Sequence, residues 1–288
     1  MYYENAKYMV LSALVYVISG RAVRKGKYMT TEEKLKKYQD WLFKCSAYHM
    51  ALNIIDIDKQ TVAPTAGAGY RDDRSAFLAG ELFSLETDPE IVELLKDLKD
   101  DPKVDAENKR AIQLYYKQAL DTLCIPKEEF VAFEKLCSES FDAWLLAKSK
   151  ADYSLFAPYL EKVIEGKKKL YGYRNSNLSI YNQMLDDFEP GMDEEKYDAF
   201  FAALKERLVP LIQKVTKAKQ LREDFLAQSF PVEEQKKFME GLLEYLHFDS
   251  SWGYQNESEH PFTSWTCEND CRTTTKYLEN NVISAILS

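Results

Sequence analysis

PKEEFVAFEKLCSESFDAW, residues 126–144, carries a strong helical signal in this chain. Its large apolar side chains recur at steps of three and four residues, so they share one face of a helix. Pro126 stands at the start, where the first helical turn does not use the missing backbone N–H. The stripe consists of Phe130, Phe133, Cys137, Phe141 and Trp144. Packing in a core explains this stripe without any ligand, so the segment predicts a helix that is buried on one face.

Further helix signals extend in both directions from this segment. Thr30 and Glu33 have the spacing of a capping box, and Asp88-Pro89 has the N-cap and the first-turn proline of another helix. After Asp193 the apolar residues follow a period of 3.6 residues, which predicts a long amphipathic helix. Its apolar face is expected to hold Tyr197, Phe200, Phe201, Leu204, Leu208, Leu211, Ile212 and Val215.

Helical periodicity fades between residues 248 and 277, where Ser, Gly, Asn, Glu and Thr dominate. Short runs at 262–265 and 272–275 favour strands in this segment. With 10 glycines and 9 prolines in 288 residues, the chain has too few turn residues for a sandwich or a barrel. We therefore expect a mainly α fold, a multi-helix domain with a small β-strand region near residues 250–277.

The charge and the cysteine content limit the classes of binding partner and indicate the cellular compartment. The net charge of -9 argues against a nucleic-acid partner, because phosphate backbones are bound by clustered Lys and Arg. The five cysteines have no spacing typical of a disulfide framework or of a structural zinc site. This pattern indicates reduced thiols and a cytoplasmic protein.

Residues 1–28 contain an apolar run at 9–19 that is about as long as a signal-peptide core. The run is shorter than the roughly 20 residues that span a bilayer, and most of its nearby positive charges follow it. We expect no membrane partner, an extension at 1–28 outside the fold, and a natural start at Met29. A membrane-tethered adaptor that uses residues 9–19 is a third, less favoured interpretation.

The segment 270–274, DCRTT, concentrates polar chemistry in the strand region. Side chains alternate between the two faces of a strand, so Asp270, Arg272 and Thr274 project together. Such a face can hold the arginine with a carboxylate and present its remaining donors to the terminal carboxylate of a peptide. An internal Asp–Arg bond that only ties the strand down explains the pattern equally well, and both interpretations stay open.

Several landmarks occur in an order that resembles the carboxypeptidase Taq family over about residues 31–288. They are Ile57-Asp58 with Thr61 and Pro64, Trp144 with Ala147-Lys148 and the segment 152–158, YNQMLDDFEPGM at 181–192, His260-Pro261-Phe262, and Asp270-x-Arg272-x-Thr274. Ile57 stands where the family usually has Trp, and Met184 and Phe188 are conservative departures. The last two motifs are specific in combination, because they lie close together and follow the earlier landmarks.

The resemblance implies a metallopeptidase in which His260, Asp270, Arg272 and Thr274 line the cleft beside the metal. For His260, a turn satisfied by local backbone remains an alternative. The family's zinc chemistry uses His-Glu-x-x-His and a further Glu downstream, the first Glu activating the metal-bound water.

This zinc motif is absent from the sequence, which has three histidines, none of them four residues apart. His49 and His247 are expected to pack on apolar helix faces. We therefore expect no catalytic residue and no metal ligand in this chain, and zinc as the cofactor of the complete family enzyme. Residues 29–288 would be an incomplete domain without its C-terminal half, with 283–288 as the start of the metal-binding helix.

Two functions follow from these expectations. The first is the N-terminal part of a zinc-dependent metallocarboxypeptidase that releases C-terminal residues from peptides and is inactive alone. The second is a non-catalytic helical module that binds peptides or proteins. A peptide is the expected partner in both cases, and a homodimer stays open.

The DNA that follows codon 288, in frame or shifted by one, is expected to encode His-Glu-x-x-His within a short distance. The helix that starts near Asn281 ends after about two turns, and a helix this short is marginal in water without a continuation. Sequencing this DNA tests the prediction. If no frame holds the motif, the expected truncation is wrong and the binding module is favoured.

Overall fold

A computed structural model of the chain describes residues 29–174, 176–226 and 228–287. The prediction that 1–28 form an extension lies outside these residues. The helices are α2 (Thr31–Thr61), α3 (Ala68–Glu86), α4 (Pro89–Leu98), α5 (Ala106–Leu123), α6 (Lys127–Lys150), α7 (Ala157–Gly172), α8 (Ile180–Phe188), α9 (Glu194–Lys217), α10 (Val232–Tyr245) and α11 (Val282–Leu287), with single 3-10 turns η1 (Thr65–Gly67), η2 (Tyr153–Leu155) and η3 (Asp224–Leu226). The strands are β1 (Gly253–Glu257), β2 (Thr263–Cys267) and β3 (Asp270–Thr275).

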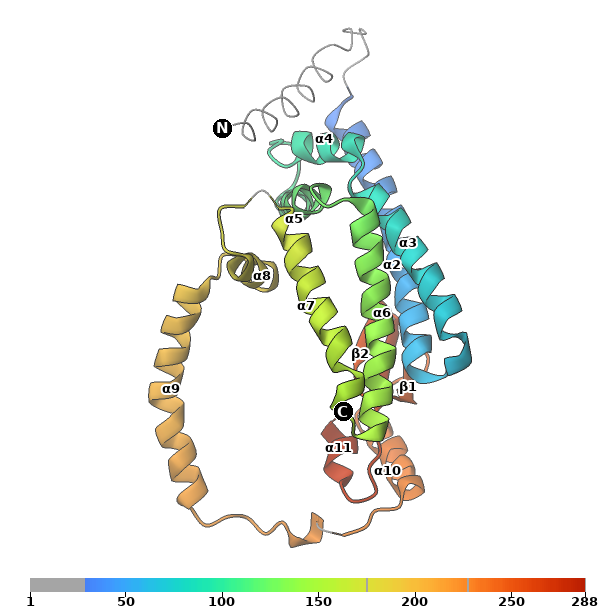
Figure 1. The fold of residues 1–288 in the computed structure, drawn as a ribbon, viewed down its shortest axis with the longest axis vertical. Helices are drawn as coiled ribbons and strands as arrows, with labels where there is room; N and C mark the ends of the chain where they lie inside the picture. Colours follow the sequence, from blue (N-terminus) through green and yellow to red (C-terminus); the bar gives the residue numbers. More distant parts are fainter. Residues whose placement is uncertain (1–28, 175, 227, 288) are drawn as a thin grey trace.

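Helices dominate the described chain and the strands form one small sheet near its C-terminal end, which confirms the expected mainly α fold (Figure 1). α2, α3, α6 and α7 run side by side as a bundle, and α4 and α5 cover one end of it. Among the helices that the structure describes, none is both long enough and apolar enough to cross a membrane.

Side-chain caps start several helices where the sequence predicts them. The Thr30 hydroxyl accepts a hydrogen bond from the backbone N–H of Glu33 (3.2 Å), and the Glu33 carboxylate accepts one from the N–H of Thr30 (2.8 Å). Asp88 and Asp193 likewise accept backbone N–H groups in the first turns of α4 and α9. Because a cap of this kind stabilises a helix by about 1 kcal/mol, these residues determine where the helices begin.

α2, α4 and α5 share the main hydrophobic core. Leu95, Leu98 and Ile112 have no exposed surface. They belong to one cluster with Tyr38 and Trp41 of α2. Burial of each large apolar side chain contributes about 1.5–3 kcal/mol, so this cluster fixes the three helices against one another.

The apolar stripe of the PKEEFVAFEKLCSESFDAW segment lies on α6, which packs against both α3 and α7 (Figure 1). Phe133 is buried in a cluster with Phe83 of α3 and Leu170 of α7. Phe130 and Cys137 pack against the same cluster. The prediction that the stripe faces a core is therefore confirmed for Phe130, Phe133 and Cys137, whereas Phe141 and Trp144 are half-buried and lie outside this cluster.

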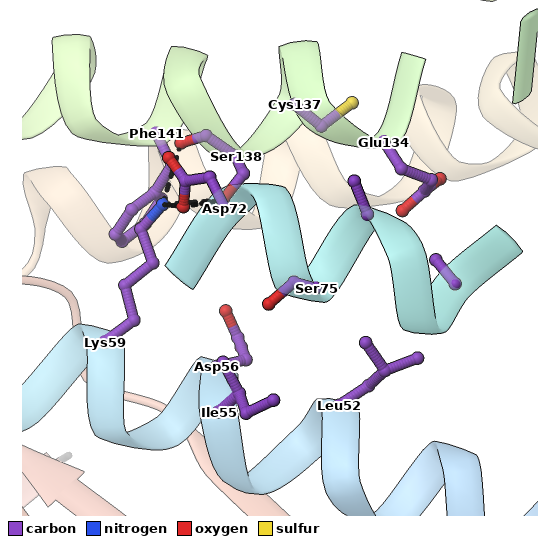
Figure 2. A pocket seen from close by; sticks show the side chains of 12 residues that line it. Leu52, Ile55, Asp56, Lys59, Asp72, Ser75, Glu134, Cys137, Ser138 and Phe141 are labelled. Carbon is purple, nitrogen blue, oxygen red and sulfur yellow. Dashed lines mark hydrogen bonds and ion pairs between the residues drawn. The ribbon is translucent and has the colours of Figure 1, made fainter. Parts of the chain in front are cut away.

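A buried ammonium group joins α2, α3 and α6. Lys59 of α2 exposes 7% of its side chain and forms ion pairs with Asp72 of α3 (2.9 Å) and Asp142 of α6 (3.2 Å). The ammonium also donates to the hydroxyl (2.7 Å) and the carbonyl oxygen (2.9 Å) of Ser138. Burial raises the pKa of the Asp142 carboxyl above its usual range, although Lys59 opposes the shift. Figure 2 shows Lys59, Asp72 and Ser138 converging beside a cavity of about 380 Å³ between the three helices.

The sheet has the strand order β1-β3-β2, with β3 parallel to β1 and antiparallel to β2. The two runs predicted as strands are β2 and β3. β1 was not predicted, because its sequence GYQNE has low strand propensity and becomes a strand by pairing with β3. The Ser264 hydroxyl of β2 donates to the Asn53 side-chain carbonyl of α2 (2.9 Å), so the sheet is attached to the helical bundle.

α9 forms where the sequence predicts it, but its apolar face lacks the contacts that such a face usually makes. Within the described part of the chain, no α9 side chain is buried. Figure 1 shows α9 standing apart from the bundle, connected to α10 by an extended segment. The N-cap and the helical periodicity therefore account for this helix, and no other element of the described chain packs over its apolar face.

The Lys59→Ala variant is expected to lose about 3–5 kcal/mol of unfolding free energy, because Asp72, with 4% of its side chain exposed, would stay buried without its cation. Urea denaturation measures this loss. Lys96→Ala on α4, which removes an exposed pair with Glu93, is the matched control and should leave the unfolding free energy nearly unchanged. Equal losses in the two variants would show that the buried pair does not hold the helices together.

Candidate functional site

Asp270 and Arg272 of β3 bind each other along the surface of the sheet. Nε of Arg272 donates to Oδ1 of Asp270 (2.5 Å), and Nη2 donates to Oδ2 (2.9 Å). The two side chains are 31% and 32% exposed, so the pair is accessible from solvent. The guanidinium holds the pKa of the Asp270 carboxyl below its usual range, and the carboxylate raises the pKa of Arg272. The two side chains share one face of the strand, as the alternation predicts.

Thr274 joins β3 to the turn that contains His260-Pro261-Phe262. The residue is 1% exposed, and its hydroxyl accepts hydrogen bonds from the backbone N–H of Phe262 (2.9 Å) and from the hydroxyl of Ser258 (2.7 Å). The backbone N–H of Thr274 donates to the carbonyl oxygen of Phe262 (2.8 Å). The His-Pro-Phe and Asp-x-Arg-x-Thr motifs are therefore parts of one hydrogen-bonded unit.

His260 lies on the exposed side of this turn, where its ring meets Trp144 of α6 at a centroid distance of 6.3 Å and an interplanar angle of 63°. The neighbouring Glu259 forms ion pairs with Lys148 of α6 (3.1 Å) and Lys276 (2.5 Å). A hydrogen bond from Lys276 is the main cause that lowers the pKa of Glu259. The turn is thus held by α6 on one side and by the strand region on the other.

A cavity of about 170 Å³ lies between the C-terminal part of α2 and the sheet. Arg272 and Thr274 line it from β3, and Asp58 and Thr61 line it from α2. The Ile57-Asp58 landmark and the Asp270-x-Arg272-x-Thr274 motif therefore line the same cavity, although they are far apart in the sequence. Asp58 and Thr61 were not predicted as site residues, although their place in the Ile57-Asp58 landmark was a signal for them. The remaining lining residues are Ile54, Ile57, Val62, Tyr254, Asn256 and Thr273.

A second hollow, of about 450 Å³, is lined by Asp270, Arg272 and Tyr254 among others. Arg272 and Tyr254 line both hollows, so both residues border the two. His260 lines neither of them. The structure thus brings Asp270, Arg272 and Thr274 together, and it places His260 on the turn that Thr274 supports.

Two carboxylates of the YNQMLDDFEPGM segment, those of Asp186 and Asp187, are engaged within the fold. Asp187 of α8 forms an ion pair with Arg174 (2.8 Å) and accepts a hydrogen bond from the Tyr171 hydroxyl (2.6 Å). Burial and Asp187 raise the pKa of Tyr171 to about 12. Asp186 accepts the backbone N–H of Gly191 (2.7 Å), whose φ of +89° favours glycine. This landmark therefore fixes α8 and the turn that follows it.

The histidines do not gather into a metal site. His49 and His247 are both exposed, which corrects the expectation that they pack on apolar helix faces. His49 instead pairs with Glu86 across the surface of α2 and α3 (3.4 Å), and His247 adopts a φ of +57° just after α10 ends. In residues 29–174, 176–226 and 228–287, no group of three or more His, Cys, Asp or Glu side chains could hold a metal ion. These residues therefore do not fit a catalytic zinc.

Comparisons with known proteins relate the chain to one family of peptidases. The sequence profile of the carboxypeptidase Taq (M32) metallopeptidases matches residues 37–288. Carboxypeptidase 1 of Bacillus subtilis (strain 168) is 33% identical over 255 residues, which are 87% of this chain and 50% of that protein. Thermostable carboxypeptidase 1 of Thermus thermophilus is 30% identical over 239 residues, 77% of this chain and 46% of that protein.

Solved structures agree with these matches. The crystal structure of BsuCP matches with a TM-score of 0.82 and 33% identity, over 88% of this chain and 51% of that one. The M32 carboxypeptidase from Deinococcus radiodurans R1 matches with a TM-score of 0.73 and 25% identity, over the same shares of the two chains. The chain spans about half the length of the curated relatives it matches. Since profile, sequence and fold agree over most of its length, the chain belongs to the carboxypeptidase Taq (M32) metallopeptidase family.

Proposed function

We propose that this chain forms the N-terminal half of a zinc-dependent carboxypeptidase, and that it supplies one wall of the cleft that binds the C-terminal end of a peptide. The family match over residues 37–288 and the coverage of about half of each relative support this proposal. The observation that carries it is the accessible Asp270–Arg272 pair, which borders a cavity lined by two family motifs.

Arg272 is the residue that we assign to the carboxylate of the substrate. Asp270 engages Nε and one N–H of Nη2, and none of the described residues hydrogen-bonds Nη1. The remaining N–H groups can donate to a terminal carboxylate or to a peptide carbonyl oxygen. The internal Asp–Arg bond is compatible with this role, because it holds the planar guanidinium in one orientation.

Two neighbours of Arg272 fit the same role. The lowered pKa of Asp270 keeps its carboxylate ionised at neutral and mildly acidic pH, so the guanidinium keeps its partner there. Tyr254 of β1 stands opposite Arg272 in the strand register and is 57% exposed. Its ring can therefore contact the side chain of a residue whose carboxylate Arg272 binds.

The metal ligands of the proposed enzyme come from polypeptide outside the described residues. Catalytic zinc sites hold the metal with three protein ligands drawn from His, Cys and carboxylates. The described residues offer no such group, so we assign no hydrolytic step to them. Their contribution is to bind the peptide and to orient its terminal carboxylate.

Residues 1–288 purified alone should contain no stoichiometric zinc and should not hydrolyse peptides. A chimera in which the C-terminal half of the Bacillus subtilis relative follows residue 288 should bind zinc, release C-terminal residues and lose this activity to a chelator, because the added half supplies the metal ligands. Elemental analysis and mass spectrometry of the peptides measure both properties. Zinc-dependent hydrolysis by 1–288 alone would contradict the proposal, and a chimera that binds peptides without hydrolysis would favour the binding module.

In this chimera, Arg272→Ala should lower kcat/KM for a peptide with a free C-terminus by about 10²-fold, because the substrate carboxylate loses its charged partner. Arg272→Lys keeps the charge but loses the two-pronged bond to Asp270, so it should lie between the alanine variant and the parent. Arg74→Ala on α3 removes another arginine beside an aspartate, 55% exposed, and should leave kcat/KM unchanged. Steady-state assays of the three variants measure kcat/KM. An Arg272→Ala enzyme with the kcat/KM of the parent chimera would exclude the role assigned to Arg272.

A further inference from the structure

α9 presents a continuous apolar surface to solvent. At 3.6 residues per turn, its large apolar side chains other than Val209 fall within about one third of the helix circumference. Phe200, Leu211 and Val215 are 54%, 54% and 55% exposed. We call this surface the α9 face, and it consists of Phe200, Phe201, Leu204, Leu208, Leu211, Ile212 and Val215.

The α9 face differs from the apolar stripes of the packed helices because it is not buried within the described chain. α4 has a comparable stripe, and its Val92, Leu94, Leu95 and Leu98 are all buried in the main core. Within the residues that the structure describes, α9 buries none of its side chains. Contiguous exposed apolar surface of this kind marks a contact with another polypeptide, because its burial is the main favourable term in association.

The relatives indicate which polypeptide covers this face. The matched region includes α9, and it accounts for 50% of the Bacillus subtilis protein and 51% of the BsuCP chain. In those proteins the helix therefore belongs to a chain about twice as long as the matched part. We propose that the α9 face docks the polypeptide equivalent to the C-terminal half of these relatives. This inference rests on the proposed function, since it names the partner that completes the enzyme.

A second uncovered apolar surface supports the same occupant. A groove of about 330 Å³ lies between η3, α10 and α11, with Phe238 and Ile286 53% and 41% exposed along it. In Figure 1, α11 lies beside α10, and the segment that leads from α9 to α10 runs along the lower edge of the molecule. In the chimera, the added half begins next to this groove, because Val282 and Ile286 of α11 line it.

Hydrogen exchange of the α9 amides tests the docking directly. In residues 1–288 alone, α9 should exchange fast, because an amphipathic helix without tertiary packing opens readily. In the chimera, the same amides should exchange at least about tenfold more slowly. The Leu204→Asp/Leu211→Asp variant of the chimera should lose this protection, since it places two charges on the α9 face.

The matched control is Ala202→Asp/Gln213→Asp, which adds the same two charges to exposed positions on the opposite side of α9. It should keep the protection seen in the parent chimera. Both variants should leave the thermal midpoint of 1–288 alone unchanged, because α9 buries no side chain there. Equal exchange of α9 in 1–288 and in the chimera, or equal loss in both variants, would overturn the proposal.

Two further readouts keep this proposal separate from the proposed function. Peptidase activity of the chimera tests the function, whereas α9 exchange tests the docking, so an inactive chimera with a protected α9 overturns only the former. Sedimentation measures self-association. A dimer of the chimera that Leu204→Asp/Leu211→Asp dissociates would mean that a second copy covers the face, and it would overturn the docking proposal.

Discussion

The ammonium of Lys59 lies in the interior of the helical bundle between two carboxylates and a serine hydroxyl, and this buried charge constrains α2, α3 and α6 together. A buried charge is stable only while its partners stay within hydrogen-bond distance, so the three helices cannot slide past one another without a large loss. Two of the constrained helices, α2 and α6, also contribute residues to the site. α2 carries Asp58 and Thr61 to the cavity beside the sheet, and α6 carries Trp144 to the turn at His260.

The two ends of β3 differ in burial and in the contacts that they make. At the buried end, Thr274 uses its hydroxyl and its backbone N–H to hold the His-Pro-Phe turn, so its polar groups are satisfied inside the protein. At the exposed end, Asp270 orients Arg272 without using all of its donors. One short strand thus connects a rigid scaffold to a guanidinium with free donors, which is the arrangement that the proposed substrate-binding wall requires.

α9 is an amphipathic helix whose apolar face no element of the described chain covers. Its cap and its periodicity are local features, and they form the helix without help from distant residues. Most of the stability of a helix in a protein nevertheless comes from packing of its apolar face, and the described residues bury none of the α9 side chains. The described residues therefore complete cores around α4 and α6, whereas the apolar face of α9 and the groove beside α11 stay uncovered within this part of the chain.

The sequence by itself determined the features that depend on neighbours within a few residues. These are the helix starts, the stripe on α6, the strands β2 and β3, and the shared face of Asp270 and Arg272. Motif order also identified the family. Only the tertiary structure decided that Lys59 is buried, that Asp58 lies beside β3, that His49 is exposed, and that the described chain leaves α9 uncovered. These outcomes depend on which elements pack together across long stretches of chain, and no local spacing encodes that choice.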